Sequence, residues 1–228
     1  QTEYNDYQAI EHDEVNLILS GKKWYGDIFG EIITRDYNFN FPNLKANEEV
    51  IVKMEVANRT FINESMSVVV NNELFDTIIL TSVNPSSTKY AQKKKKTIYY
   101  NGTGGQDIHV KLEYLPATTS SISWLDYIMV NAICNLKLYN GQFSFRDLST
   151  VLDGAITKFI ISDANPNVVV WDISNPLLPK RMESEYTINE VSFTLATDSL
   201  HEFIAFDGSM FLTPEFAEAV ENQNLHNE

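Results

Sequence analysis

Cysteine peptidases and metal centres need cysteine and histidine side chains held close together, and this sequence offers few of them. Cys134 is the one cysteine of the 228-residue chain. A nucleophilic cysteine needs a thiolate with a base beside it. Cys134 lies instead in residues 124–138, an alternating run in which its own face is almost wholly apolar. We predict a protonated, inert core cysteine, and keep a hydrolase that uses Cys134 as a rival hypothesis.

The histidines also lack the spacing of a metal site. No Cys-x-x-Cys and no His-Glu-x-x-His is present. We therefore assign no catalytic, cofactor-binding or metal-binding residue, and we expect His226 to help pack a connector against a following domain. The four histidines are His12, His109, His201 and His226.

Two loops resemble ligand-binding motifs only in part. Residues 101–105 are glycine-rich but lack the Gly-Lys-Ser/Thr ending of a phosphate loop, so we expect a hairpin loop. Residues 163–167 open like a calcium loop. However, Val168 stands where such a loop needs glycine, and Ser174 where it needs a bidentate glutamate. We predict a turn there, while a calcium ion elsewhere in the protein stays an open alternative.

Two surface features suggest binding but have simpler explanations. The lysines of residues 93–96 form a basic patch on an acidic chain. They suit a solvated loop or a charge-protected edge strand better than docking to an anionic glycan. Five aromatic residues are candidates for a sugar-stacking platform. Each lies within a hydrophobic run, which favours core packing. They are Trp24, Tyr25, Trp124, Tyr127 and Trp171.

Composition excludes several classes of function. The formal net charge of −14 argues against a nucleic-acid partner, which needs a basic surface, and against adsorption to anionic lipid. No apolar run reaches the roughly 18–20 residues that span a bilayer, so we expect no direct membrane insertion. The first residues lack the basic and apolar regions of a signal peptide. A mature or trimmed chain would lack them too, so this feature does not indicate a cytoplasmic protein.

Period-2 alternation indicates an all-β fold. Residues 50–56 place Val50, Val52, Met54 and Val56 on one face, and similar short runs recur between Asn, Gly and Pro turn signals. Many short strands at regular spacing predict an antiparallel, jelly-roll-like β-sandwich. The abundant aromatic residues suit sheets whose faces pack on each other.

The chain is expected to divide into three parts. Residues 1–20 are a lead-in, and residues 21–212 form the β-sandwich, with a division near residue 141 left open. Residues 213–228 are predicted to be a short helical connector to a following domain. Thr213 can cap a helix there, and Pro214 fits its first turn.

Several runs, taken in order, resemble one family. Residues 168–176 and 222–226 resemble the segment just before the catalytic domain of gingipain-family cysteine peptidases, in particular the sortase of the bacterial type IX (Por) secretion system. Residues 21–29 are similar to the G-x-x-W-[YF]-G-[ED]-x-F run of these sortases. Residues 124–127 and 143–146 are similar to two later runs in the same order.

The resemblance implies a non-catalytic accessory or scaffolding domain of a secreted or surface cysteine endopeptidase that cleaves the C-terminal signals of exported cargo. The catalytic residues would belong to the following peptidase domain, so none is carried over. The implied partners are that domain, secretion-system outer-membrane proteins and cargo. The implied location is extracytoplasmic, at the outer membrane or cell surface of a member of the Bacteroidetes. The alternative is a stand-alone carbohydrate-binding β-sandwich on a bacterial surface.

Overall fold

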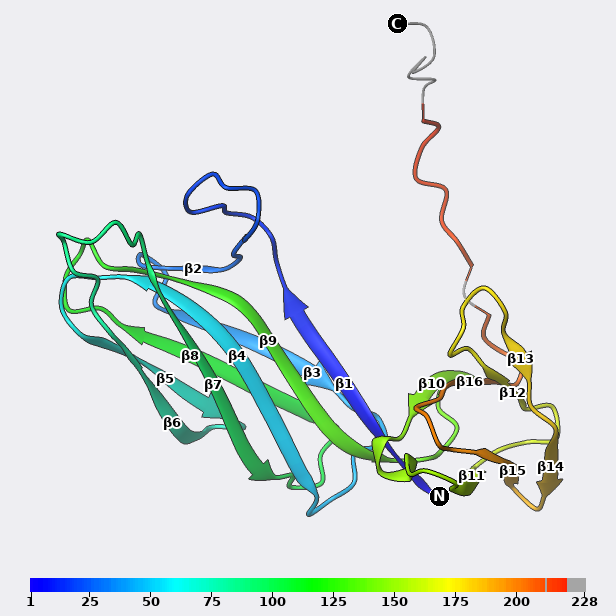
Figure 1. The fold of residues 1–228 in the computed structure, drawn as a ribbon. Coiled ribbons are helices and arrows are strands. Elements are labelled where there is room, and N and C mark those ends of the chain that lie inside the picture. The colour runs from blue at the N-terminus through cyan, green and yellow to red at the C-terminus, as the bar shows by residue number, and fades with distance from the viewer. Residues whose placement is uncertain (212, 221–228) are drawn as a thin grey trace, which may run out of the picture.

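The computed structural model describes residues 1–211 and 213–220 (Figure 1). In these residues the chain forms sixteen β-strands and one short 3₁₀ helix, η1 (Leu148–Thr150). The sequence-based prediction of an all-β fold is therefore confirmed. None of the helical structure described is long and apolar enough to cross a membrane.

The first two sheets together hold β1 to β9. Neighbouring strands within each sheet are antiparallel. One sheet contains, in order, β1 (Glu3–Glu11), β9 (Ile122–Asn135), β4 (Glu49–Arg59) and β7 (Gln92–Asn101), with β2 (Ile28–Phe29) also paired to β9; the other contains β3 (Thr34–Asn40), β8 (Asp107–Leu115), β5 (Glu64–Val70) and β6 (Glu73–Leu80).

This strand order is that of a jelly roll. Leaving the two-residue β2 aside, successive strands alternate between the two sheets, except for the β5–β6 hairpin. Two four-stranded sheets connected in this way make a jelly roll, which is the fold that the period-2 patterns of the sequence predicted. The expected lead-in, residues 1–20, contains β1, which pairs along its whole length with β9.

The jelly-roll core follows directly from the period-2 patterns. Val50, Val52, Met54 and Val56 of β4 are all buried and belong to the main hydrophobic core. Alternate residues of β9 join them, because β9 is an interior strand with one face toward the core. The buried residues of that face are Ile128, Val130, Ala132 and Cys134.

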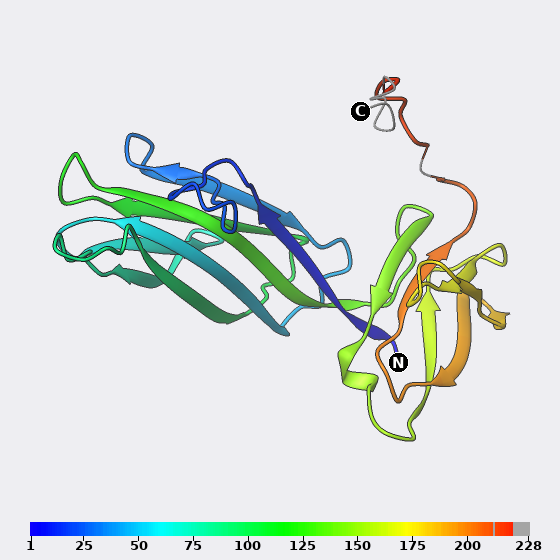
Figure 2. The ribbon, with the colours of Figure 1, turned by 45° about the horizontal axis from the view of Figure 1, so that its top comes forward.

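A second, smaller pair of sheets follows in the chain. The chain leaves the jelly roll after Asn135, the end of β9, and enters the next sheet at Gln142, the start of β10 (Figure 2). The division near residue 141 that the sequence left open lies in this connecting segment. One sheet contains β10 (Gln142–Arg146), β16 (Glu202–Phe206), β12 (Val169–Asp172) and β13 (Lys180–Arg181); the other contains β11 (Ile156–Ser162), β15 (Glu190–Ala196) and β14 (Ser184–Thr187).

Phenylalanines fill the centre of this second pair of sheets. Phe145 stacks on Phe203 at 5.1 Å between ring centroids, and Phe159 stacks on Phe193 at 5.2 Å. All four rings are buried. Aromatic pairs at these separations add to the stability that apolar burial provides.

Two local predictions were wrong. Residues 102–106 do not close a hairpin, because β7 and β8 lie in different sheets and the loop crosses between them. The predicted helical connector is also incorrect for residues 213–220, which contain no helix. Phe216 and Val220 are 85% and 82% exposed there, so a helix would have no apolar surface to pack on. Isolated helices this short are marginal in water. Residues 221–228 of the predicted connector, including His226, lie outside the described residues.

A long loop, residues 12–27, folds onto the outer face of the first jelly-roll sheet. Tyr25 and Val15 pair with each other, and the N–H of Gly26 donates to the carbonyl of Leu125 at 2.9 Å. Tyr25 packs on Trp124, and both are buried. The loop therefore closes a small apolar cluster outside the main core. We call residues 12–27 the cover loop.

A β-bulge places buried charge under the cover loop. The register of β4 and β9 shifts so that Glu55 faces Tyr127 while Val56 faces Leu125, which leaves Asp126 as the extra residue. Burial raises the pKa of Asp126, and its carboxylate is matched by the ammonium group of Lys23 from the cover loop. The loop is thus attached by an ion pair as well as by apolar contact.

Gly26 is required where the cover loop meets the jelly roll. A Cβ at this position would lie 2.6 Å from the Cβ of His12 and 2.7 Å from its carbonyl oxygen. We expect Gly26→Ala to lower the free energy of unfolding by about 1–3 kcal/mol, measured by urea denaturation. Gly105→Ala is the matched control, since a Cβ at Gly105 meets nothing within 4 Å. Equal effects of the two substitutions would contradict this account of the loop.

Candidate functional site at the sheet junction

The first residues of the chain connect the jelly roll to the second pair of sheets. β1 runs along β9, and just before it the carbonyl of Thr2 accepts a hydrogen bond from the N–H of Leu136 at 2.7 Å. The carbonyl of Gln1 accepts from the N–H of Ile160 in β11 at 2.9 Å. A single extended segment therefore satisfies backbone groups in both sheet pairs.

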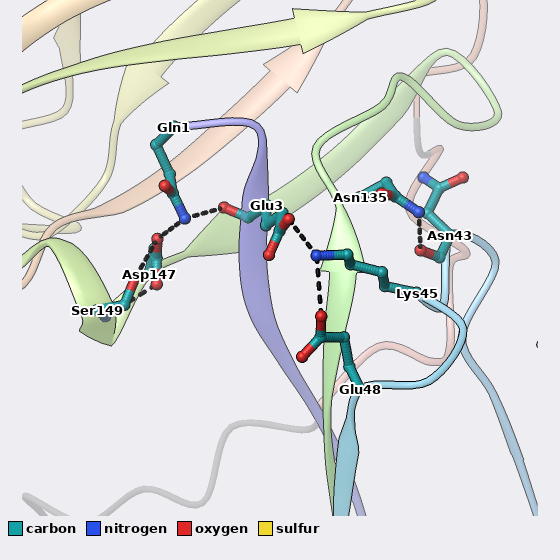
Figure 3. Close-up of polar contacts among 8 residues, drawn as sticks. All are labelled: Gln1, Glu3, Asn43, Lys45, Glu48, Asn135, Asp147 and Ser149. Carbon is teal, nitrogen blue, oxygen red and sulfur yellow. Dashed lines mark hydrogen bonds and ion pairs between the residues drawn. The ribbon is translucent and has the colours of Figure 1, made fainter. Parts of the chain in front are cut away.

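Polar side chains reinforce this crossing point (Figure 3). The side-chain amide of Gln1 donates to the carbonyl of Glu3 at 3.0 Å and also to the carboxylate of Asp147. Asp147 is buried and also accepts from the N–H and the hydroxyl of Ser149, each at 2.9 Å. Asp147 thereby caps η1 and attaches it to the start of the chain.

A second group of polar residues ties the loop after β3 to both β1 and β9. The ammonium group of Lys45 bridges the carboxylates of Glu3 and Glu48 (Figure 3). The N–H of Asn135 donates to the carbonyl of Asn43 at 2.8 Å, and the side-chain amide of Asn43 donates to the carbonyl of Lys137 at 2.8 Å. This loop therefore supports the segment by which the chain leaves the jelly roll.

The exit segment itself pairs with the second sheet pair. Leu138 donates its N–H to the carbonyl of Ser162, and Ser162 donates its own N–H to the carbonyl of Leu136, each at 3.0 Å. Leu136 is buried in the same continuous apolar cluster as Tyr4 and Phe145. The rings of Tyr4 and Phe145 meet edge to face, with their centroids 6.1 Å apart. The two sheet pairs thus share one hydrophobic core across the junction.

A hollow of about 340 Å³ lies beside this junction. The guanidinium group of Arg146 lies 4.2 Å from the ring centroid of Tyr7 and pairs with Glu202 at 2.9 Å. Asp6 also lines the hollow, and burial raises the pKa of its carboxyl group. The described lining contains neither cysteine nor histidine, so it offers no activated thiol and no imidazole base.

Cys134 is fully buried in β9, as the sequence predicted. Burial raises the pKa of its thiol to about 12, and the nearby Asp6 carboxylate adds to the rise. The described residues include no histidine that hydrogen-bonds to it. A thiol with this environment is protonated at neutral pH, which argues against the rival hypothesis of a Cys134 hydrolase.

Sequence reasoning missed one cluster of residue types that resembles a catalytic triad. The carboxylate of Asp172 accepts from the hydroxyl of Ser174 at 2.6 Å and contacts Nδ1 of His201 at 2.8 Å. Burial opposes ionisation of Asp172, but the hydrogen bonds from Ser174 and His201 outweigh it and lower its pKa. In a triad the histidine lies between the hydroxyl and the carboxylate. Here the carboxylate lies in the middle, so the hydroxyl of Ser174 donates to Asp172 and has no imidazole base.

The other candidates do not assemble into a site. Tyr25 and Trp124 are buried, and Trp171 lies in β12 of the second sheet pair, so the five aromatic residues form no common stacking platform. Residues 163–167 form a turn in which the N–H of Val168 donates to the carbonyl of Asn165 at 3.1 Å. No group of three or more carboxylate, histidine or cysteine side chains suited to a metal occurs in the described part of the chain.

Comparison with known proteins includes a likeness that extends over the whole chain. No family model and no curated protein sequence matches it. In a crystal structure, dimeric latent PorU from Porphyromonas gingivalis matches 100% of this chain with a TM-score of 0.83 at 22% sequence identity. The chain spans only 22% of the length of that PorU chain. At this identity the likeness establishes the fold.

Carbohydrate-binding modules give partial matches. The CBM36-1 domain of a multidomain xylanase from the hindgut metagenome of Trinervitermes trinervoides matches 55% of this chain, with 96% of its own length, at 9% identity and a TM-score of 0.38. A family 35 module from Clostridium thermocellum matches 55% of this chain, with 90% of its own length, at 14% identity and a TM-score of 0.35.

The Asp147 contacts predict that one side chain stabilises the junction. Asp147→Ala removes the buried carboxylate that accepts from the half-buried amide of Gln1 and from the backbone N–H and hydroxyl of Ser149, and with it the cap of η1. We expect the free energy of unfolding to fall by about 1–3 kcal/mol in urea denaturation followed by tryptophan fluorescence. Asp153→Ala, at an exposed position, is the control and is expected to change it by less than about 0.5 kcal/mol. An unchanged free energy of unfolding for Asp147→Ala would mean that this carboxylate does not stabilise the junction.

Burial of Cys134 predicts resistance to alkylation. With a thiol pKa of about 12, the thiolate fraction at pH 8 is on the order of one in ten thousand. We expect iodoacetamide to leave the folded protein unmodified at pH 8, by intact-mass spectrometry, and to add one group in urea. Stoichiometric labelling of the folded protein would mean that the thiol is accessible and would revive the hydrolase hypothesis.

Proposed function

We propose that this chain is a non-catalytic scaffolding domain of a secreted or surface cysteine endopeptidase of the gingipain family, specifically a type IX secretion-system sortase. In this proposal a peptidase domain follows in the same polypeptide and carries the catalytic residues. The protein acts at the outer membrane or cell surface of a member of the Bacteroidetes, and its partners include secretion-system outer-membrane proteins and cargo.

The observation that carries the proposal is the likeness to PorU over the whole chain. A TM-score of 0.83 with full coverage means that the jelly roll and the second sheet pair superpose together. Jelly rolls alone serve many functions, so a match to either part would carry little weight. The resemblance found in the sequence is to the sortase of the Por secretion system, and the name PorU agrees with it.

The spatial arrangement of the sortase-like runs gives independent support. The run at residues 21–29 lies in the cover loop and β2, and the run at residues 124–127 contains the bulge of β9. Although far apart in the sequence, they meet through the Lys23–Asp126 ion pair and through β2, whose Ile28 pairs with Trp124. The two motifs are thus halves of one structural feature, which favours a common origin over chance similarity.

The junction suits a scaffold. Its shared apolar core and the backbone pairing of residues 1–2 oppose hinge motion between the two sheet pairs, because bending would expose buried groups. A rigid support of this kind can hold a following domain at a fixed distance and orientation.

The first experiment is an immunoblot of the source bacterium, using antibody raised against this chain. We expect a band several times larger than the 26.0 kDa of the chain, in the outer-membrane fraction. The larger mass would correspond to an additional peptidase domain, which mass spectrometry of the band can identify. A soluble band near 26.0 kDa would overturn the proposal and direct attention to ligand screening.

A further inference from the structure

One corner of the jelly roll combines a hollow with an excess of positive charge. The hollow of about 350 Å³ lies between the cover loop and the residues leading into β7. Lys23, Lys89 and Lys93 line it, and its described lining includes no carboxylate. On a chain with net charge −14, this is a local reversal of sign. Its apolar wall includes Leu17, Tyr25 and Tyr90.

Buried carboxylates compensate only part of this charge. Lys23 pairs with Asp126, while Lys93 and Lys95 share Glu55 at 3.7 and 3.4 Å. Three ammonium groups therefore meet two carboxylates. Lys89 and Lys94, at the same corner, form no ion pair with a described residue. The corner keeps a positive excess after internal pairing, so it complements a negatively charged partner.

The hollow leads directly onto an open sheet edge. β7 is the outermost strand of its sheet and pairs only with β4 among the described strands. Residues 93–96 lie in this edge strand. Of the two simpler explanations that the sequence offered for the lysines, the structure agrees with the charge-protected edge strand. An unpaired edge presents N–H and C=O groups that can accept another extended segment.

The lysine run selects which segment can add to this edge. A second copy of β7 would place lysine against lysine, and like charges directly opposite are destabilising. Neutral strands gain nothing from the charge. Within the run, Lys96 pairs with Asp76 of β6, Lys93 and Lys95 share the single carboxylate of Glu55, and Lys94 pairs with no described carboxylate. An acidic strand meets the charge that remains, so the same lysines that disfavour self-association favour an acidic partner.

We propose that β7 and the adjoining hollow bind an extended acidic segment of a partner protein. The segment adds a strand to the edge of β7, places its carboxylates beside the lysines, and inserts an apolar side chain between the cover loop and Tyr90. This inference goes beyond the proposed function and does not depend on it.

The probe is a fluorescein-labelled peptide of about ten residues, matching the length of β7, with alternating glutamate and threonine and one central leucine. We expect saturable binding to the 228-residue chain by fluorescence anisotropy, and about tenfold weaker binding when salt is raised from 50 to about 500 mM. Three control peptides separate the contributions. One replaces glutamate by glutamine, one replaces the leucine by glycine, and one carries N-methyl groups on alternate backbone nitrogens.

Each control peptide is expected to bind at least about fivefold more weakly. Unchanged binding of the N-methylated peptide would show charge attraction without strand addition and would overturn the proposal. Absence of binding at about 1 mM peptide would overturn it as well, even if dextran sulfate or anionic vesicles bind.

Variants of the chain locate the site. Lys94→Glu and Lys89→Glu are expected to weaken binding about tenfold each, because each replaces a positive charge beside the acidic peptide by a negative one. We choose these two lysines because neither belongs to an ion pair among the described residues that the substitution would break. Lys180→Glu is the matched control, since Lys180 is an exposed lysine on β13, another edge strand. An equal loss of binding in Lys180→Glu would mean that the peptide responds to net charge alone, which would overturn the assignment. Circular dichroism of each variant verifies that it is folded.

Discussion

The arrangement of the whole molecule depends on the backbone pairing of its first eleven residues. β1 uses its hydrogen bonds on β9, while Gln1 and Thr2 extend the same segment to β11 and to the exit of β9. An extended segment has fixed reach and direction, so pairing it in both places sets the distance and orientation between the sheet pairs. The apolar cluster that runs from Tyr4 to Phe145 can close only in that arrangement. The polar junction and the shared core are consequences of one constraint.

Buried carboxylates hold the loops that the jelly roll cannot fix by apolar packing. Asp126 holds the cover loop through Lys23, and Asp147 holds η1. Glu64 accepts from the N–H of Ala117 at 2.9 Å and so fixes the loop before β9. Burial opposes ionisation of Glu64, but hydrogen bonds, led by that from Ser121, outweigh it and lower its pKa. In each case a buried charge is acceptable because specific donors match it, and those donors define the position of the loop.

The sequence predicted what alternation and burial decide. The apolar faces of β4 and β9 and the inert state of Cys134 follow from side chains that must avoid water. β1 was missed because an edge strand with many polar residues carries little period-2 signal. The bulge at Asp126 was missed because the alternating run continues past it without a break. The helix expected at 213–220 was wrong because a capping signal cannot replace an apolar surface to pack on. The junction depends on which strands become neighbours, and local pattern contains no such information.

The position of β16 determines how a pulling force would enter the molecule. β16 leads to residues 213–220, which extend away from the sheets (Figure 1). β16 lies between β10 and β12 and is antiparallel to both. Tension applied through the C-terminal segment would act along an interior strand whose hydrogen bonds lie across the direction of pull. These bonds would have to shear together on both sides, and Phe203 and Ala205 would have to leave the core at the same time. The interior position of β16 would therefore act as a mechanical clamp against a load applied along the C-terminal segment.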